Sequence, residues 1–162
     1  MKPMGFFDKV KTFAGGASML SIEFVEVERQ DPRGVSVPAG DSGVKGKFRV
    51  TCNKPCTVLG HIDELRTRCQ AKDGEIGTAQ VSDESDASTE VTGRDWQFPL
   101  DMKPGDAVDM WFMLYGDELG SYYAKYGVPV GDPSVEFFVK VTVDVKGSPF
   151  DPEAELTFKI TP

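Results

Sequence analysis

The sequence lacks most of the residues on which catalytic and metal-binding sites depend. Its 162 residues include one histidine, His61, and three cysteines. A zinc site needs about four nitrogen or sulfur ligands, and a nucleophilic serine needs a histidine within hydrogen-bond reach. Neither set can be assembled here, and no glycine-rich loop carries the lysine and serine of a phosphate site. The sequence therefore predicts no catalytic residue, no metal ligand and no cofactor, and it argues against an enzyme.

Long apolar runs and an excess of positive charge are missing as well. No apolar stretch approaches the roughly 18 residues of a transmembrane helix, and the start of the chain lacks the apolar core of a secretory signal. The net charge of −8 repels phosphate backbones, which disfavours nucleic acid as a partner. A small, odd number of cysteines does not make a secreted disulfide framework. We expect a cytoplasmic protein with reduced thiols, although a hairpin could bring Cys52 and Cys56 together for oxidation.

Alternation of apolar and polar residues is the dominant pattern that is present. Period two is typical of strands with one buried face, and a change of phase between Phe24 and Val25 predicts a β-bulge. No helices are interleaved, as a parallel sheet would require. The sequence thus predicts an all-β fold, an antiparallel β-sandwich over residues 19–162. The expected strands are 20–27, 44–50, 57–69, 96–100, 108–114, 137–145 and 154–160.

Two segments depart from this alternation. Residues 71–90 carry six acidic residues against one lysine, which predicts a long solvated loop that holds at most a poorly formed edge strand at 76–81. Residues 116–134 are irregular, and we expect a single helical turn near 119–125.

The start of the chain has helical spacing instead. Phe6, Val10 and Phe13 fall at i, i+4 and i+7, with Phe7 beside them. We predict a short amphipathic helix and linker over residues 1–18. Each buried apolar side chain gains about 1.5–3 kcal/mol, so the helix should dock. Its own sandwich, a neighbouring subunit and, weakly, a membrane surface all remain open as the docking site.

A cationic stripe is the second candidate partner-binding surface. Lys45, Lys47 and Arg49 alternate with apolar residues along 44–50, so their side chains should share the outer face of a strand. On an acidic protein this stripe suits an acidic partner or an acidic segment of another copy. The alternative is an ordinary solvated strand face.

Three tyrosines in the irregular segment are the third candidate surface, namely Tyr122, Tyr123 and Tyr126. Tyrosine is favoured at interfaces because a rigid apolar ring carries one polar tip. The same rings can instead pack over the open end of a sandwich.

Several short segments carry a family resemblance through their order along the chain. They are MGFFDKVK at 4–11, VPAG at 37–40 in a turn, GVKGKFRV at 43–50, IDEL at 62–65, WQFPL at 96–100, and VTVDV at 141–145 followed by Asp151-Pro152. In this order they are similar to the bacterial sporulation-control protein M family, whose members have an arrestin-like fold. The resemblance covers the first of the family's two lobes, and residues 117–133 look like an insertion.

The resemblance implies an arrestin-like β-sandwich and a non-enzymatic adaptor or scaffold in sporulation or stress regulation. Such a protein acts through protein–protein contacts, and an exposed edge strand suits them because its backbone groups can pair with a partner's strand. The alternative is a self-assembling structural subunit of a tube, shell or filament. The sequence does not name the partner proteins, and a homo-oligomer remains open.

Overall fold

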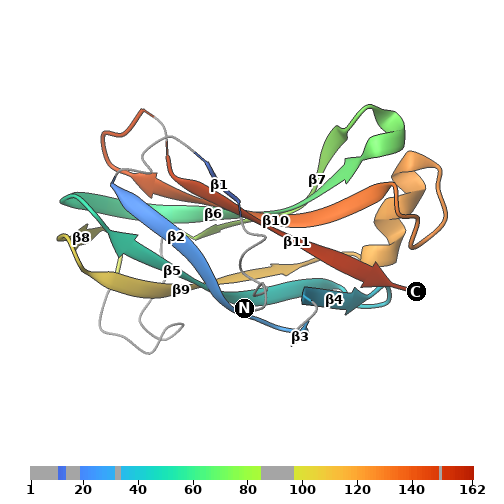
Figure 1. Ribbon diagram of the computed structural model, residues 1–162, viewed down its shortest axis with the longest axis horizontal. Coiled ribbons are helices and arrows are strands. Elements are labelled where there is room, and N and C mark those ends of the chain that lie inside the picture. Colours follow the sequence, from blue (N-terminus) through green and yellow to red (C-terminus); the bar gives the residue numbers. More distant parts are fainter. Residues whose placement is uncertain (1–10, 14–18, 32–33, 85–96, 150) are drawn as a thin grey trace, which may run out of the picture.

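The computed structural model describes residues 11–13, 19–31, 34–84, 97–149 and 151–162. These residues form two β-sheets that face each other across an apolar core, as Figure 1 shows. The predicted all-β sandwich is therefore confirmed. Within the described ranges, no helix is long and apolar enough to cross a membrane.

The larger sheet has eight strands. In spatial order they are β3 (Gln30–Asp31), β4 (Gly34–Pro38), β11 (Glu153–Thr161), β10 (Val135–Val145), β6 (Cys56–Cys69) and β7 (Glu75–Glu84), with β1 (Lys11–Phe13) beside β11 and β8 (Leu100–Met102) beside β6. β4 and β11 run parallel. The prediction of an antiparallel sandwich is therefore wrong for this pair of strands. β4 also occupies part of the expected turn at 37–40, because Val35 and Val37 are both buried in the core.

The smaller sheet is antiparallel and has three strands, in the order β2 (Leu20–Val27), β5 (Gly43–Cys52) and β9 (Ala107–Tyr115). The register of β2 against β5 shifts between Phe24 and Glu26, which confirms the predicted bulge. The core face of this sheet is aromatic. The ring centroid of Phe24 lies 6.4 Å from that of Phe48 and 5.8 Å from that of Phe112.

The predicted N-terminal helix lies mostly outside the described residues, including Phe6, Phe7 and Val10. Where the described chain begins, Lys11–Phe13 form strand β1, which pairs antiparallel with β11. The helix prediction is wrong for these three residues. Strand pairing satisfies backbone groups that the edge of β11 would otherwise leave to water.

The acidic segment holds a strand where a solvated loop was the main expectation. Glu75–Glu84 form the ten-residue strand β7 on β6, joined to it by the 3₁₀ turn η2 (Gln70–Lys72). The polar composition of β7 concealed the strand, since Gly77 and Gln80 alone are buried among the positions of β7 whose burial is described. The helical turn expected near 119–125 is confirmed as the 3₁₀ helix η3 (Leu119–Tyr126). η3 lies at the end of the sandwich where β10 begins (Figure 1).

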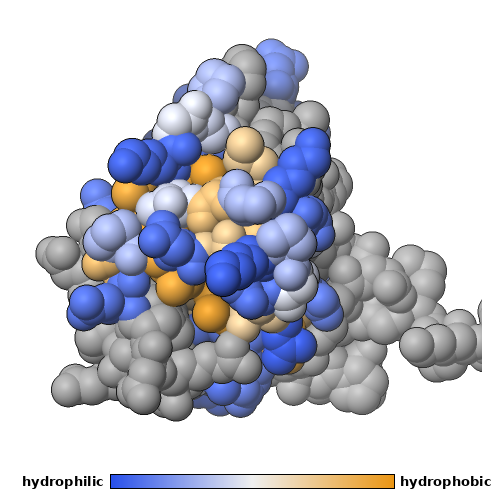
Figure 2. Space-filling model, turned by 90° about the vertical axis from the view of Figure 1, so that its left-hand side faces the viewer, coloured by the Kyte–Doolittle hydropathy of each residue, from blue (hydrophilic) through white to orange (hydrophobic). Residues whose placement is uncertain are grey.

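The opposite end carries the β5–β6 hairpin and β8. Figure 2 views this end and shows hydrophobic side chains among hydrophilic ones. β8 begins at Leu100, where the predicted strand 96–100 was expected to end. Its register pairs Leu100 with Val58, so the alternation was right but the segment was placed too early.

Gly46 marks a close approach within the smaller sheet. A Cβ at this position would lie 2.5 Å from the backbone oxygen of Glu26 and 2.8 Å from Cζ of Phe112. We expect Gly46→Ala to lower the free energy of unfolding by about 2 kcal/mol, as overpacked substitutions do, measured by urea denaturation. In the matched control Gly40→Ala, the new Cβ has no neighbour within 4 Å, and the change should stay within about 0.5 kcal/mol. Equal stability of the two variants would contradict this account.

Candidate partner-binding surfaces

The cationic stripe lies on the outer face of the smaller sheet, as predicted, but its charges are paired within the chain. The pairs are Arg49–Asp109 at 2.8 Å, Lys47–Glu26 at 3.6 Å and Lys45–Glu28 at 4.0 Å. Arg49 donates hydrogen bonds to both carboxylate oxygens of Asp109. This hydrogen bond and the charge of Asp109 raise the pKa of Arg49 above its ordinary value. The face is therefore less cationic than the sequence of β5 indicates.

Next to the stripe, β9 carries a row of large side chains that the sequence analysis did not select. Trp111, Met113 and Tyr115 share the outer face, and Met113 and Tyr115 are 43% and 56% exposed. The ammonium of Lys47 lies 5.2 Å from the Trp111 ring centroid, within the range of a cation–π contact. Alternation along 108–114 already predicts that Trp111 and Met113 face outward, so these exposed side chains could have been found from the sequence.

The tyrosines of η3 divide into two buried rings and one at the surface. Tyr123 and Tyr126 are buried, whereas Tyr122 is half-buried. The Tyr123 ring centroid lies 5.3 Å from that of Phe137, and the hydroxyls of Tyr126 and Thr67 share a hydrogen bond of 2.6 Å. Burial also raises the pKa of Tyr123. Partner binding by these residues stays a prediction, and burial disfavours direct contact through Tyr123 and Tyr126.

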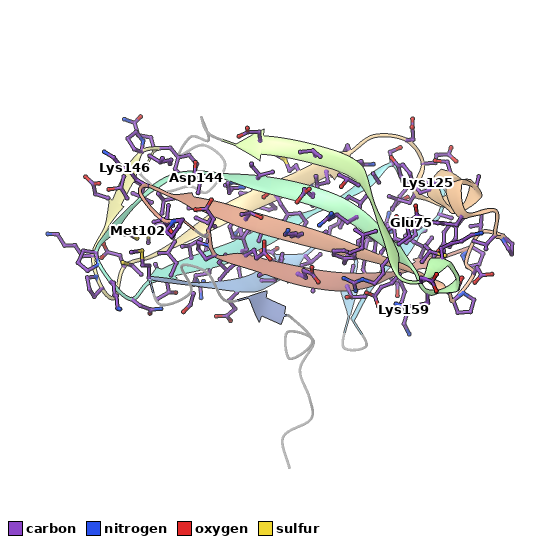
Figure 3. All side chains as sticks on the ribbon, turned by 90° about the horizontal axis from the view of Figure 1, so that it is seen from above. Glu75, Met102, Lys125, Asp144, Lys146 and Lys159 are labelled. Atoms are coloured by element: carbon purple, nitrogen blue, oxygen red, sulfur yellow. The ribbon has the colours of Figure 1, made fainter. Side chains whose placement is uncertain are left out.

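The larger sheet ends at β7, which pairs with β6 alone among the described strands. Figure 3 views the outer face of this sheet, with β7 at its margin. Val81 on this face is 61% exposed, and Ile76 and Ile62 are also exposed. Val81 pairs with Glu64, and Ile62 is the neighbouring outward residue of β6. The apolar side chains of Val81 and Ile62 are therefore diagonal neighbours across the two strands.

The core-facing side of β7 is fixed by polar contacts to the end of the sandwich. Gln80 Nε2 donates to the backbone oxygen of Ser42 and to the Tyr122 hydroxyl, each at 3.2 Å. A cavity of about 180 Å³ lies between β6, β7 and η3. Its lining residues are Thr67, Gly77, Thr78, Ala79, Tyr122 and Lys125. Gln80 thus links the core-facing side of β7 to the end of the sandwich, whereas Ile76 and Val81 on its outer face are exposed to solvent.

An acidic cavity of about 250 Å³ lies at the other end of β7. Three of its lining residues are aspartates, and the full set is Gly60, His61, Ile62, Asp83, Thr142, Asp144 and Asp151. Burial, and then the charges of Asp151 and Asp83, raise the pKa of Asp144. Among the residues that the structure describes, no group of three or more His, Cys, Asp or Glu is placed to hold a metal ion.

The raised pKa of Asp144 gives a pH-dependent prediction. A carboxyl whose pKa is higher in the folded state stabilises the fold most below its ordinary pKa, and this contribution is lost as the pH rises through the raised value. We expect Asp144→Asn to be more stable than the wild type at pH 7, with a difference that disappears near pH 3. Urea denaturation at both pH values measures it.

Asp132 serves as the control of opposite sign for this measurement. Hydrogen bonds from Ser134 lower the pKa of Asp132, so Asp132→Asn should remove stability that is present at pH 7 and lost on acidification. A loss of stability at pH 7 in Asp144→Asn would contradict the prediction for the acidic cavity.

The three cysteines are free thiols. Cys52 Sγ donates to the backbone oxygen of Lys54 at 2.9 Å. Burial, together with the neighbouring Cys52, raises the pKa of Cys56 to about 11. Because the thiolate is the reactive form, Cys56 is poorly suited to attack at neutral pH.

Comparison with known proteins gives matches among solved structures alone. No family model matches this chain, and no curated protein sequence matches it. Spo0M, a sporulation control protein from Bacillus subtilis, matches with a TM-score of 0.57 at 16% identity, covering 89% of this chain and 50% of Spo0M. The C-terminal domain of wzt matches with a TM-score of 0.47 at 10% identity, covering 98% of this chain and 83% of that one. This chain thus spans about half the length of Spo0M. The match with Spo0M shows that the chain has a Spo0M-like β-sandwich fold.

Proposed function

We propose that this chain is a non-enzymatic adaptor that binds partner proteins through one side of its β-sandwich. The main support for this proposal is the position of the exposed apolar side chains. Among the described residues, six large hydrophobic side chains are exposed, and all but Val130 lie on β6, β7 or β9. β7 and β9 are the terminal strands of their sheets and approach each other. The exposed apolar side chains thus lie on the outer faces of both sheets, next to the edge at which β7 and β9 meet, and we infer that this side of the sandwich is the interaction site.

The chemistry of the described residues supports binding rather than catalysis. His61, the single histidine, is 2% exposed and is hydrogen-bonded to the buried Asp63 at 2.7 Å. A general base needs access to the proton that it removes. The fold shared with Spo0M, a sporulation control protein, supports a regulatory role in the cytoplasm, in sporulation or stress regulation.

Affinity capture from an extract of the source cells tests the adaptor function. The full chain serves as bait beside the double variant Val81→Glu/Met113→Glu and the control Val130→Glu. All three positions are exposed, at 61%, 43% and 47%, so none should unfold the protein. We expect wild type and control to retain the same proteins and the double variant to lose them. Identical capture by all three, or capture by none, contradicts the proposal.

Light scattering at high protein concentration distinguishes the alternative, a self-assembling subunit of a tube, shell or filament. A monomer supports the adaptor. Growth into large assemblies that the double variant abolishes would instead favour the structural subunit, because the same apolar side would then join copies of the chain.

A further inference from the structure

We propose that a cavity between η3, β10 and β11 binds a small zwitterion with an aromatic or large aliphatic body, such as a free aromatic amino acid. The cavity has a volume of about 420 Å³, within the range of small-molecule sites. It is lined by none of the exposed apolar residues that support the adaptor function. The cavity therefore adds a second binding function that does not depend on the first.

The cavity lies where two neighbouring strands part. The antiparallel pairing of β10 with β11 stops at Phe137 and Phe158. Beyond this point β10 continues on β6, with Val135 opposite Cys69, whereas β11 continues on β4. Residues of both strands line the cavity at this fork, and residues of η3 and of the segment 131–133 form the rest of its wall.

Three aromatic rings form a row along the wall. The ring centroid of Phe137 lies 5.3 Å from that of Tyr123 and 5.9 Å from that of Phe158. Val135 and Ile160 add aliphatic side chains beside these rings. Apolar and aromatic lining with a small number of polar groups is typical of ligand pockets, and an aromatic ligand can pack against the rings edge to face or offset.

The charged residues of the wall define the polar groups of the ligand. Glu136 is already neutralised, because Arg68 Nη1 donates to its Oε1 at 2.8 Å. Asp132 and Lys159 also line the cavity, and neither takes part in the ion pairs that the described residues form. One carboxylate and one ammonium thus remain to be paired. Their complement is a molecule that itself carries one ammonium and one carboxylate.

Asp132 is held in place as an acceptor for the ammonium of the ligand. The backbone N–H of Ser134 donates to Asp132 Oδ1 at 2.8 Å, and the lowered pKa of this carboxyl keeps it ionised at neutral pH. Burial, and then the charge of Asp132, raise the pKa of Tyr123. The Tyr123 hydroxyl therefore keeps its proton and can donate to the ligand.

A ligand with a single charge fits this wall less well. A carboxylate without an ammonium would face the charge of Asp132 with nothing to offset it. An ammonium without a carboxylate would leave Lys159 unpaired. The zwitterion alone satisfies both side chains.

The test uses the full ¹⁵N-labelled chain and three probes of one shape. They are L-phenylalanine, 2-phenylethylamine, which lacks the carboxylate, and 3-phenylpropionate, which lacks the ammonium. We expect L-phenylalanine to shift the amides of residues 131–137 and 157–160 and to bind with a dissociation constant of about 1 mM or lower. Each of the other probes loses one ion pair and should bind at least about threefold more weakly.

Variants of the two charged residues assign each ion pair. In Lys159→Gln, L-phenylalanine should bind no more tightly than 2-phenylethylamine. In Asp132→Asn, it should bind no more tightly than 3-phenylpropionate. Lys146→Gln is the matched control, because this exposed lysine lies at the opposite end of the sandwich from Lys159 (Figure 3). It should leave all three affinities unchanged, and the amide spectrum of each variant reports whether it is folded.

Several results would overturn the proposal. One is the absence of amide shifts with L-phenylalanine at about 10 mM, well above the expected dissociation constant. Others are shifts confined to residues outside the cavity, or a probe with one charge that binds as tightly as L-phenylalanine. A selectivity that stays as in the wild type in either Lys159→Gln or Asp132→Asn would also contradict it.

Discussion

Replacing Phe48 by alanine should lower the free energy of unfolding by about 3–5 kcal/mol, the usual cost of removing a large buried aromatic side chain. Phe48 is completely buried on β5, and its ring centroid lies 5.0 Å from that of His61 on β6. The ring thus joins the two sheets. Urea denaturation measures the effect, with the exposed Tyr115→Ala as the control that should change stability little. A loss below about 1 kcal/mol in Phe48→Ala would mean that the sheets do not pack as described.

The second large effect concerns the buried pair of His61 and Asp63, whose Nδ1 and Oδ1 atoms lie 2.7 Å apart. His61→Leu introduces an apolar side chain of similar size and removes this contact from a fully buried carboxylate. Breaking a buried pair by removing one partner costs about 3–5 kcal/mol, and we expect a loss in this range.

The double variant His61→Leu/Asp63→Val isolates the cause of that loss. Replacing both members of a buried pair by apolar residues is often nearly neutral, so the double variant should be more stable than His61→Leu alone. Denaturation curves of the wild type, both single variants and the double variant complete the cycle. Additive losses would show that the carboxylate of Asp63 does not depend on His61.

Alternation predicted the main strands because burial of one face leaves a local pattern in the sequence. It failed where tertiary pairing outweighs that pattern. Among the positions of β7 whose burial is described, two are buried, so alternation is weak there. β7 forms a strand because its backbone pairs with β6. β4 depends on Val35 and Val37 within a segment that has turn residues. Lys11–Phe13 become a strand because β11 offers an edge.

The candidate surfaces were predictable in position but not in environment. Alternation placed Lys45, Lys47 and Arg49 on one outer face. Their acidic partners come from neighbouring strands, and Asp109 lies 60 positions from Arg49. No local pattern reveals such a pair. The burial of Tyr123 was equally invisible, because it depends on Phe137 from another strand.

Amide hydrogen exchange of the full chain, free and bound to a captured native partner, tests the central claim most directly. The account predicts new protection of amides in β7 and β9, with the β5–β6 hairpin unchanged. Protection confined to other strands, or no new protection in the complex, would contradict binding at this edge of the sandwich.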